Sequence, residues 1–398
     1  MATSAGVNMP GGPGASSSTP KCGDKRSRPA SPSSSSSSDQ GLPDKEGEEE
    51  QVGLGPLATA GLAPPALPAA AQVWPVAFGW MDLQGRPRGM EDTVSLHPGF
   101  CAWADGSPMH FFAVFDGHGG SSVSVLCRER MHVILAEELA AGAAAYLHWR
   151  GEQMNGAGVV VGAEQQEELA WRAALSRCFR RVDAMAALAC ACGRISFPRC
   201  RCPLALDPRC GIVGSTAVVA VLVRDRLIVA NCGDSRAVLC RGPPGAPAVP
   251  LSSDHKPERP DEMARIQAVG GWVLCNNGPR VRGILAMTRA LGDWLLRPEV
   301  ISEPEITITR RRVEDDCLIL ASDGMWDVVE NETACNIARH CLDDVNPAPV
   351  AGAGAAAAVG PDPDPRCNIA ACLLVRLAMC RGSQDNVSVV VVDLKPRG

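Results

Sequence analysis

One pattern constrains this chain more than any other: a short apolar run that ends in an aspartate beside glycine or another small residue. It occurs as Phe-Phe-Ala-Val-Phe-Asp116-Gly, Ile-Val-Ala-Asn-Cys-Gly-Asp234 and Leu-Ile-Leu-Ala-Ser-Asp323-Gly. A fourth acid, Asp385, precedes a run of valines instead. Because neighbouring antiparallel strands run in opposite directions, the start of one strand lies beside the end of the next. The pattern therefore predicts an antiparallel sheet edge that gathers carboxylates.

The remaining periodicity predicts an α+β fold. Strands are expected where short β-branched runs are bounded by turn residues, at Phe111–Phe115, Ser215–Val223, Arg226–Asn231, Arg236–Cys240, Asp316–Ala321 and Asn386–Asp393. Helices are expected at Ser121–Leu139, Trp171–Met185, Asp261–Val269, Glu332–Cys341 and Asn368–Arg381. Several strand connections are too short for a helical crossover, so the strands form a meander. This favours a layered sandwich over a doubly wound parallel fold.

Low-complexity segments mark the domain limits. Residues 1–70 are rich in Ser, Pro, Gly and Ala and are predicted to be a disordered tail, while 71–398 form one domain. Residues 346–365 are predicted to be a flexible loop insert within that domain. The tail's basic cluster is either a nuclear-import signal or a solvated patch: Lys21, Lys25, Arg26 and Arg28.

Composition excludes several function classes. The net charge of −6 gives no broad attraction to nucleic acid, and no apolar run approaches the roughly 20 residues of a membrane-spanning helix. The 18 cysteines occur in a long chain without an N-terminal apolar export segment, so most are expected to be reduced thiols. We therefore expect an intracellular protein of the nucleus, the cytoplasm or both.

The convergent carboxylates predict a metal site. Glu91 and Asp92 join the acids named above, and such a cluster must either take up protons or bind cations. Oxygen ligands without Cys or His favour Mg²⁺, Mn²⁺ or Ca²⁺ over Zn²⁺. Each aspartate taken alone is better explained as a turn or cap residue, and the metal prediction depends on the repeated set.

His118 lies two residues after Asp116, in a glycine-rich turn that lacks the Lys-Ser/Thr ending of a P-loop. An imidazole at this place is suited to protonate an alkoxide leaving group near neutral pH.

Eight segments, in order, carry a family resemblance: Met90-Glu-Asp92, Phe111-Phe-Ala-Val-Phe-Asp116-Gly-His-Gly-Gly, Gly214-Ser-Thr-Ala, Ala230-Asn-Cys-Gly-Asp-Ser-Arg236-Ala-Val, Ser253-Asp-His-Lys-Pro257, Gly283-Ile-Leu-Ala-Met-Thr-Arg-Ala-Leu-Gly-Asp293, Ala321-Ser-Asp-Gly-Met-Trp-Asp327 and Asp385-Asn-Val-Ser. Over about Trp80 to Asp393 the chain resembles the type 2C metal-dependent Ser/Thr protein phosphatases, specifically the plant members near the abscisic-acid co-receptor branch.

The resemblance implies a four-layer αββα sandwich with two Mg²⁺ or Mn²⁺ ions at one edge and a third, weaker site. Asp116 would bridge both ions, Glu91 and the Gly117 carbonyl would hold one, and Asp323 and Asp385 the other. The third site would use Asp234 with Asp323 or Asp327. Asp92 and Asp293 would surround the metal ligands and contact them directly or through water molecules. A water activated by the ions would attack phosphorus and His118 would protonate the leaving oxygen. Phosphorylated proteins are the implied substrates, and protein kinases are further candidate partners.

The chain departs from the family pattern at Pro87, where a phosphate-contacting arginine is usual. Arg86 and Arg88 flank it as candidate substitutes, but neighbouring residues of a strand point to opposite faces. We therefore expect weaker phosphate binding. The main alternative function, a catalytically weak phosphatase-like binding protein, rests on this change. A Ca²⁺-binding module lacks the EF-hand spacing.

A second departure concerns the hormone co-receptors, which the segment Gly270–Val281 resembles. Asn276 stands where those proteins have a Trp that inserts into the hormone receptor, and Asn cannot fill that apolar pocket. Trp272 is interpreted as ordinary packing, so binding to a hormone receptor is doubtful.

A cysteine cluster precedes the Gly-Ser-Thr strand: Cys190, Cys192, Cys200, Cys202 and Cys210. Its Cys-x-Cys spacings differ from the usual Cys-x₂₋₄-Cys of zinc sites. Structural zinc, redox sensitivity and inert thiols all stay open, with inert thiols favoured.

Overall fold

The computed structural model describes residues 76–87, 89–154, 162–196, 200–203, 212–275, 278–343 and 363–395. Contacts divide the chain into units 1–64 and 65–398, and every described residue belongs to the second. The predicted tail 1–70, most of the predicted insert 346–365, and Arg88, Asn276 and Cys210 lie outside the described residues.

Two five-stranded sheets form the centre of the domain. The first has the order β1 (Ala77–Leu83), β15 (Val387–Asp393), β14 (Asp315–Ala321), β8 (Arg236–Arg241) and β9 (Val249–Pro250). The second has the order β13 (Glu305–Arg310), β7 (Arg226–Cys232), β6 (Ala217–Val223), β3 (Pro108–Phe115) and β2 (Thr93–Ala102). All pairings within these two sheets are antiparallel. The predicted antiparallel pairing is confirmed for β6 and β7. The predicted meander does not continue into β8, because the link at Gly233–Ser235 leads from β7 in the second sheet to β8 in the first.

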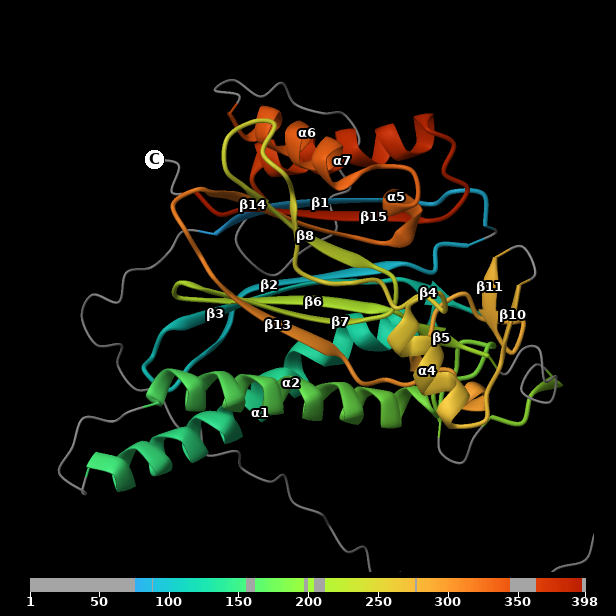
Figure 1. Cartoon of the computed structure of the whole chain (residues 1–398), viewed down its shortest axis with the longest axis horizontal. Helices are drawn as coiled ribbons and strands as arrows, with labels where there is room; N and C mark the ends of the chain where they lie inside the picture. Colours follow the sequence, from blue (N-terminus) through green and yellow to red (C-terminus); the bar gives the residue numbers. More distant parts are fainter. Residues whose placement is uncertain are drawn as a thin grey trace, which may run out of the picture. The chain divides into compact units, whose positions relative to one another are not determined.

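Helices cover the outer face of each sheet (Figure 1). α1 (Ser122–Met154) and α2 (Ala163–Ala186) pack on the second sheet, and α6 (Asn331–Asp343) and α7 (Pro365–Cys380) pack on the first. The predicted four-layer αββα sandwich is therefore confirmed. None of the described helices combines the length and the apolar character that crossing a bilayer requires.

The alternation of side chains along β3 explains why the layers hold together. Phe111, Ala113 and Phe115 face α1 and α2, whereas Phe112 and Val114 face the other sheet. All five are fully buried, and burying a phenylalanine contributes about 2 to 3 kcal/mol. Both faces of the central strands are covered, so their sequences are continuous apolar runs instead of alternating ones.

The strand and helix predictions hold with shifted boundaries. The predicted strand Ser215–Val223 divides into β5 (Gly214–Ser215) and β6, and α1 continues past the predicted end at Leu139. Three of the longer strands were missed: β1 contains Gly79 and Asp82, β2 contains a proline, and β13 is a half-exposed edge strand with alternating polar residues.

Smaller elements lie beside one edge of the sandwich. A three-stranded sheet has the order β12 (Leu291–Gly292), β5 and β4 (Gly117–His118). Next to it are α4 (Pro260–Ala268), the hairpin of β10 (Val273–Cys275) and β11 (Pro279–Val281), and the 3₁₀ helix η1 (Trp294–Leu296). A separate apolar cluster around Ile266, Val281 and Leu296 supports them. This sheet carries His118 at a fixed position.

One disulfide, between Cys240 and Cys335, joins β8 to α6 with a Cα–Cα distance of 5.3 Å. The sequence predicted mostly reduced thiols and gave no signal for this pair, whose members lie 95 residues apart.

Candidate active site

Strand pairing brings the predicted acids to one edge of both sheets. Phe115, at the end of β3, pairs with Thr93, at the start of β2, so Asp116 lies beside the Glu91-Asp92 segment. β3 and β7 both pair antiparallel with β6, so they end at the same edge, and Asp234 follows β7.

The other sheet adds two acids through the pairing of β14 with β15. Ala321 pairs with Val389, so Asp323 follows the end of β14 while Asp385 precedes the start of β15. Asp323 opens the short helix α5 (Asp323–Trp326), and Asp327 is the residue directly after that helix. The acids of both sheets interact electrostatically: the neighbours that raise the pKa of Asp116 are Asp92, Asp323, Asp234 and Asp385.

The crowded carboxylates have raised pKa values. Burial is the main cause for Asp116 and Asp323, and the neighbouring negative charges add to it, so both pKa values lie well above the usual range. Burial also raises the pKa of Asp92 to about 6 and raises the pKa values of Glu91 and Asp327. Since burial and repulsion both disfavour ionised carboxylates, the site needs added positive charge to stay ionised at neutral pH.

The donor set fits divalent cations such as Mg²⁺ and Mn²⁺. Oxygen atoms dominate the cluster, and one of them, Oδ1 of Asp234, is buried without a hydrogen-bond partner among the described residues. A buried oxygen of this kind is costly unless a cation or water satisfies it. Hard oxygen donors are the ligands that these ions prefer.

Backbone contacts fix the position of Asp116. Its N–H donates to Oγ1 of Thr216 at 3.1 Å, and the Thr216 N–H donates to the Asp116 carbonyl at 2.8 Å. The Thr216 hydroxyl also contacts the hydroxyl of Ser235 at 2.7 Å. The Gly-Ser-Thr segment therefore acts as a support for Asp116 that links it to the residue after Asp234.

His118 is paired with Asp293 through Nε2 and Oδ2 at 2.7 Å. Burial alone lowers the pKa of His118, but the charge and hydrogen bond of Asp293 outweigh it and the pKa is raised. The sequence placed Asp293 behind the metal ligands and did not predict this contact. Gly214 makes it sterically feasible: a Cβ there would lie 2.6 Å from His118 Nε2 and closer still to Asp293 Oδ2.

Three residues near the acids had no role in the sequence prediction. Lys256 donates to Oδ2 of Asp234 and lies 3.9 Å from Oδ2 of Asp323. Arg236 forms two bonds with Asp254, at 2.9 and 2.6 Å. Asn386 accepts from the Glu91 N–H at 2.8 Å. All three stand inside the segments that carry the family resemblance, which was the only available signal.

The segment around Pro87 differs from expectation. β1 ends at Leu83 and β2 begins at Thr93, so Arg86 and Pro87 lie in a loop and not in a strand. The argument from opposite strand faces was therefore wrong for these positions. Arg86 is exposed, and its N–H donates to the carbonyl of Gln384 at 3.1 Å, which keeps this loop beside Asp385.

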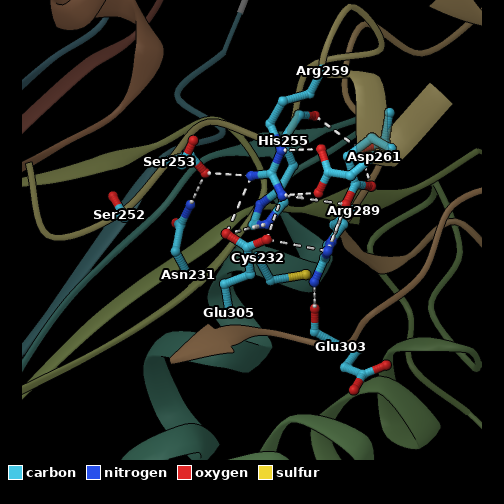
Figure 2. A network of polar contacts seen from close by, with 12 residues as sticks. Asn231, Cys232, Ser252, Ser253, His255, Arg259, Asp261, Arg289, Glu303 and Glu305 are labelled. Atoms are coloured by element: carbon cyan, nitrogen blue, oxygen red, sulfur yellow. Dashed lines mark hydrogen bonds and ion pairs between the residues drawn. The ribbon is translucent and has the colours of Figure 1, made fainter. Parts of the chain in front are cut away.

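A second polar region lies next to the acids, and Figure 2 shows its arginines surrounded by carboxylates. Arg259 donates to Asp261 and Glu305, and Arg289 donates to the Glu303 carbonyl at 2.9 Å. His255 accepts from the Gly233 N–H at 3.1 Å, which joins this region to the Asp234 segment. We call it the arginine network: His255, Arg259, Asp261, Glu262, Arg265, Thr288, Arg289 and Glu305.

The sequence is similar to that of known protein phosphatases. Residues 76–153 and 165–387 match the protein phosphatase 2C family. "Probable protein phosphatase 2C 37" of Oryza sativa subsp. japonica is 48% identical over 387 residues, covering 84% of this chain and 79% of the relative. "Probable protein phosphatase 2C 75" of Arabidopsis thaliana is 45% identical, covering 88% of this chain and 84% of the relative.

Solved structures agree at the level of the fold. A serine-threonine phosphatase 2C from Toxoplasma gondii aligns with a TM-score of 0.57 at 22% identity, covering 81% of this chain and 96% of that one. A sex-determining protein of C. elegans aligns with the same TM-score and identity, covering 65% of its own length.

The family match, together with the αββα sandwich and its acidic edge, defines a metal-dependent phosphatase. This chain belongs to the protein phosphatase 2C family and is a Ser/Thr protein phosphatase with plant relatives.

Proposed function

We propose that phosphoserine and phosphothreonine of protein substrates are hydrolysed at the carboxylate edge, with two Mg²⁺ or Mn²⁺ ions bound. Asp116 would contact both ions, Glu91 and the Gly117 carbonyl one, and Asp323 and Asp385 the other. Asp234, with Asp323 or Asp327, would hold a third ion. The observation that carries this proposal is the convergence of carboxylates at one edge, where burial and the neighbouring acids raise the pKa values of Asp116 and Asp323.

When bound, such ions activate a water molecule and offset negative charge on the phosphoryl group. The chain's own residues perform the remaining work. Asp92 and Asn386 support the ligand segments, since Asp92 neighbours Asp116 and Asn386 bonds the Glu91 N–H. Asp293 orients His118 through Nε2. Nδ1 of His118 is buried and has no partner among the described residues, so it is the nitrogen left to donate a proton to the leaving oxygen.

The same proposal covers the finer assignments. Residues 71–398 would form the phosphatase domain of an intracellular signalling enzyme of nucleus or cytoplasm, with phosphoproteins as substrates and protein kinases as further partners. The segment Gly270–Val281 supports a place near the abscisic-acid co-receptor branch, whereas Asn276 argues against tight binding to a hormone receptor.

Metal-dependent hydrolysis of a phosphopeptide tests the site. We expect turnover by the wild type with Mn²⁺ and none after chelation, and a loss of about 10³-fold or more for Asp116→Ala, equivalent to about 4 kcal/mol of activation free energy. Glu303→Gln, an exposed acid outside the cluster, is the matched control and should keep full activity.

Circular dichroism would confirm that Asp116→Ala is folded. Metal-dependent turnover that survives in this variant would contradict the assigned site. Phosphopeptide binding by the wild type without any turnover would instead favour the phosphatase-like binding protein.

A further inference from the structure

Four cysteine sulfurs converge between α2 and β5, apart from the carboxylate edge. Cys190, Cys192, Cys200 and Cys202 each place Sγ within 4.8 Å of the other three. Sγ of Cys190 lies 3.5 Å from Sγ of Cys202, and Sγ of Cys192 lies 3.7 Å from Sγ of Cys200. Disulfide-bonded sulfurs lie only about 2 Å apart, so neither contact is a disulfide.

These separations are those of sulfurs around one metal ion. A zinc–sulfur bond is about 2.3 Å long, so the sulfurs of a regular tetrahedron lie about 3.8 Å apart. The two measured contacts are within a few tenths of an ångström of that edge length, and the 4.8 Å limit holds for the whole set.

The backbone around the sulfurs forms two similar arms. In each Cys-x-Cys pair the second residue's N–H bonds the first residue's sulfur, from Cys192 to Cys190 and from Cys202 to Cys200. The first arm is closed by a turn, in which the Cys190 N–H donates to the Arg194 carbonyl at 2.9 Å and the Gly193 N–H donates to the Cys190 carbonyl at 2.8 Å. Backbone donors of this kind help to orient the ligands of a metal ion.

We propose that Cys190, Cys192, Cys200 and Cys202 bind one structural Zn²⁺ ion as four thiolates. Thiolate donors select soft or borderline ions, and a closed set of four is typical of structural zinc, whereas Mg²⁺ and Mn²⁺ prefer oxygen. Binding would release the protons of the thiols to solvent. The favoured interpretation of this cluster as inert thiols is thereby replaced, because the short Cys-x-Cys spacing does not prevent convergence.

The only other comparable group among the described residues, His255, Glu262 and Glu305, does not support the same inference. Arginines already contact both of its carboxylates: Arg289 and Arg265 bond Glu262, and Arg259 bonds Glu305. Arg194 and Arg201, by contrast, are exposed and lie close to the four cysteines in sequence.

The cysteine site packs against the turn that follows His118. The Ser122 hydroxyl lies 3.5 Å from the Cys190 carbonyl, and a Cβ on Gly120 would lie 3.7 Å from the Ala191 carbonyl. A Cβ on Gly119 would lie 2.0 Å from the carbonyl oxygen of Ile212, which follows the cysteine segment in the sequence. Zinc would therefore hold this segment against the Gly119-Gly120 turn and restrict the position of His118.

The test is metal analysis of the full-length chain, purified with zinc and then washed with excess Mg²⁺ to clear the carboxylate edge. We expect about one zinc per chain in the wild type and in Asp116→Ala. Cys192→Ser and Cys200→Ser should lose most of it, while Cys275→Ser, an exposed cysteine outside the group, should keep it.

Two measurements on the wild type avoid any dependence on folding of the variants. X-ray absorption at the zinc edge should show four sulfur neighbours at about 2.3 Å. Titration with a mercurial reagent should release the zinc as the thiols react, because Cys192 is exposed. Zinc bound mainly by oxygen, zinc lost in Asp116→Ala but kept in both cysteine variants, or less than a tenth of a zinc per chain would each overturn the proposal.

Discussion

The carboxylate edge and the arginine network are neighbours with opposite electrostatics. In the first, burial raises the pKa values of Asp116 and Asp323 and nearby acids raise them further. In the second, burial alone would raise the pKa of Glu262, but bonds from Arg289, Thr288 and Arg265 outweigh it and lower the pKa to about 2. The Gly233 N–H that bonds His255 lies one residue before Asp234, so the chain passes directly from one region to the other.

The two regions show how the charge of neighbouring side chains changes the pKa of a buried carboxyl group. Where arginines surround a buried carboxylate, its charge is matched within the protein and contributes to the stability of the folded state. Where acids surround one another, as around Asp116 and Asp323, Lys256 matches only part of the charge, and a bound cation is needed for the rest. Substitutions in the two regions should therefore separate activity from stability.

The largest expected effect is on activity, at the carboxylate edge. Asp323→Asn should lower kcat/KM with a phosphopeptide by about 10³-fold, because a proposed metal ligand is lost. The same change should leave the metal-free protein as stable or about 1 kcal/mol more stable, because it relieves repulsion among buried acids. Urea unfolding with chelator, beside steady-state kinetics with Mn²⁺, measures both. If Asp323→Asn markedly destabilised the metal-free protein, the negative charge of Asp323 would have to be matched by positive charge within the protein.

The second effect is on stability, in the arginine network. Glu262→Gln should lower the unfolding free energy at neutral pH by an amount on the order of 3 kcal/mol, since the carboxyl pKa falls from about 4.5 to about 2 on folding. A depressed pKa stabilises the folded state above about pH 4.5, and this contribution disappears as the pH falls toward 2.

Denaturant unfolding between pH 2 and 7 measures this contribution. Wild-type stability should rise with pH across the window from 2 to 4.5, and the rise should be smaller in Glu262→Gln. Activity of the folded variant should stay within a few-fold of the wild type. Equal pH slopes in the two proteins would remove Glu262 as a source of acid sensitivity.

The smallest effect concerns Lys256, which links the two regions. Its ammonium group bonds Asp234, and although burial lowers its pKa, the Asp234 charge raises it overall. Lys256→Gln should free Asp234 for a cation, so half-maximal activity should need a few-fold less Mn²⁺. Lys395→Gln, whose ammonium group pairs with Asp316 away from the site, is the control. A higher Mn²⁺ requirement in Lys256→Gln would argue that this lysine supports the metal centre instead of competing with it.

Features carried by local pattern could be predicted from the sequence. Apolar runs located the central strands, and the antiparallel rule placed Asp385 on the same edge as Asp323. Features that depend on tertiary packing could not be predicted. Glu262 and Arg289 lie 27 residues apart with no shared motif to connect them, and the contact between His118 and Asp293 spans 175 residues.

The cysteine group shows the limit of spacing rules. Counting residues between Cys190 and Cys192 suggested poor zinc geometry, since a single intervening residue is unusual. The fold changes this conclusion, because Cys200 and Cys202 come back to the first pair and supply the other two sulfurs. Likewise, the argument about Arg86 and Arg88 assumed a strand around Pro87, but a loop connects β1 to β2 there.

The position of β15 has a consequence for biosynthesis. This strand lies between β1 and β14, so the earliest and the latest strands of the domain meet inside one sheet, and Asp385 comes just before it. While β15 is still inside the ribosome, the emerged part of the chain lacks the strand between β1 and β14, and Asp385 is not yet in place as a proposed metal ligand. The enzyme therefore cannot dephosphorylate anything until β15 has left the ribosome and joined the sheet.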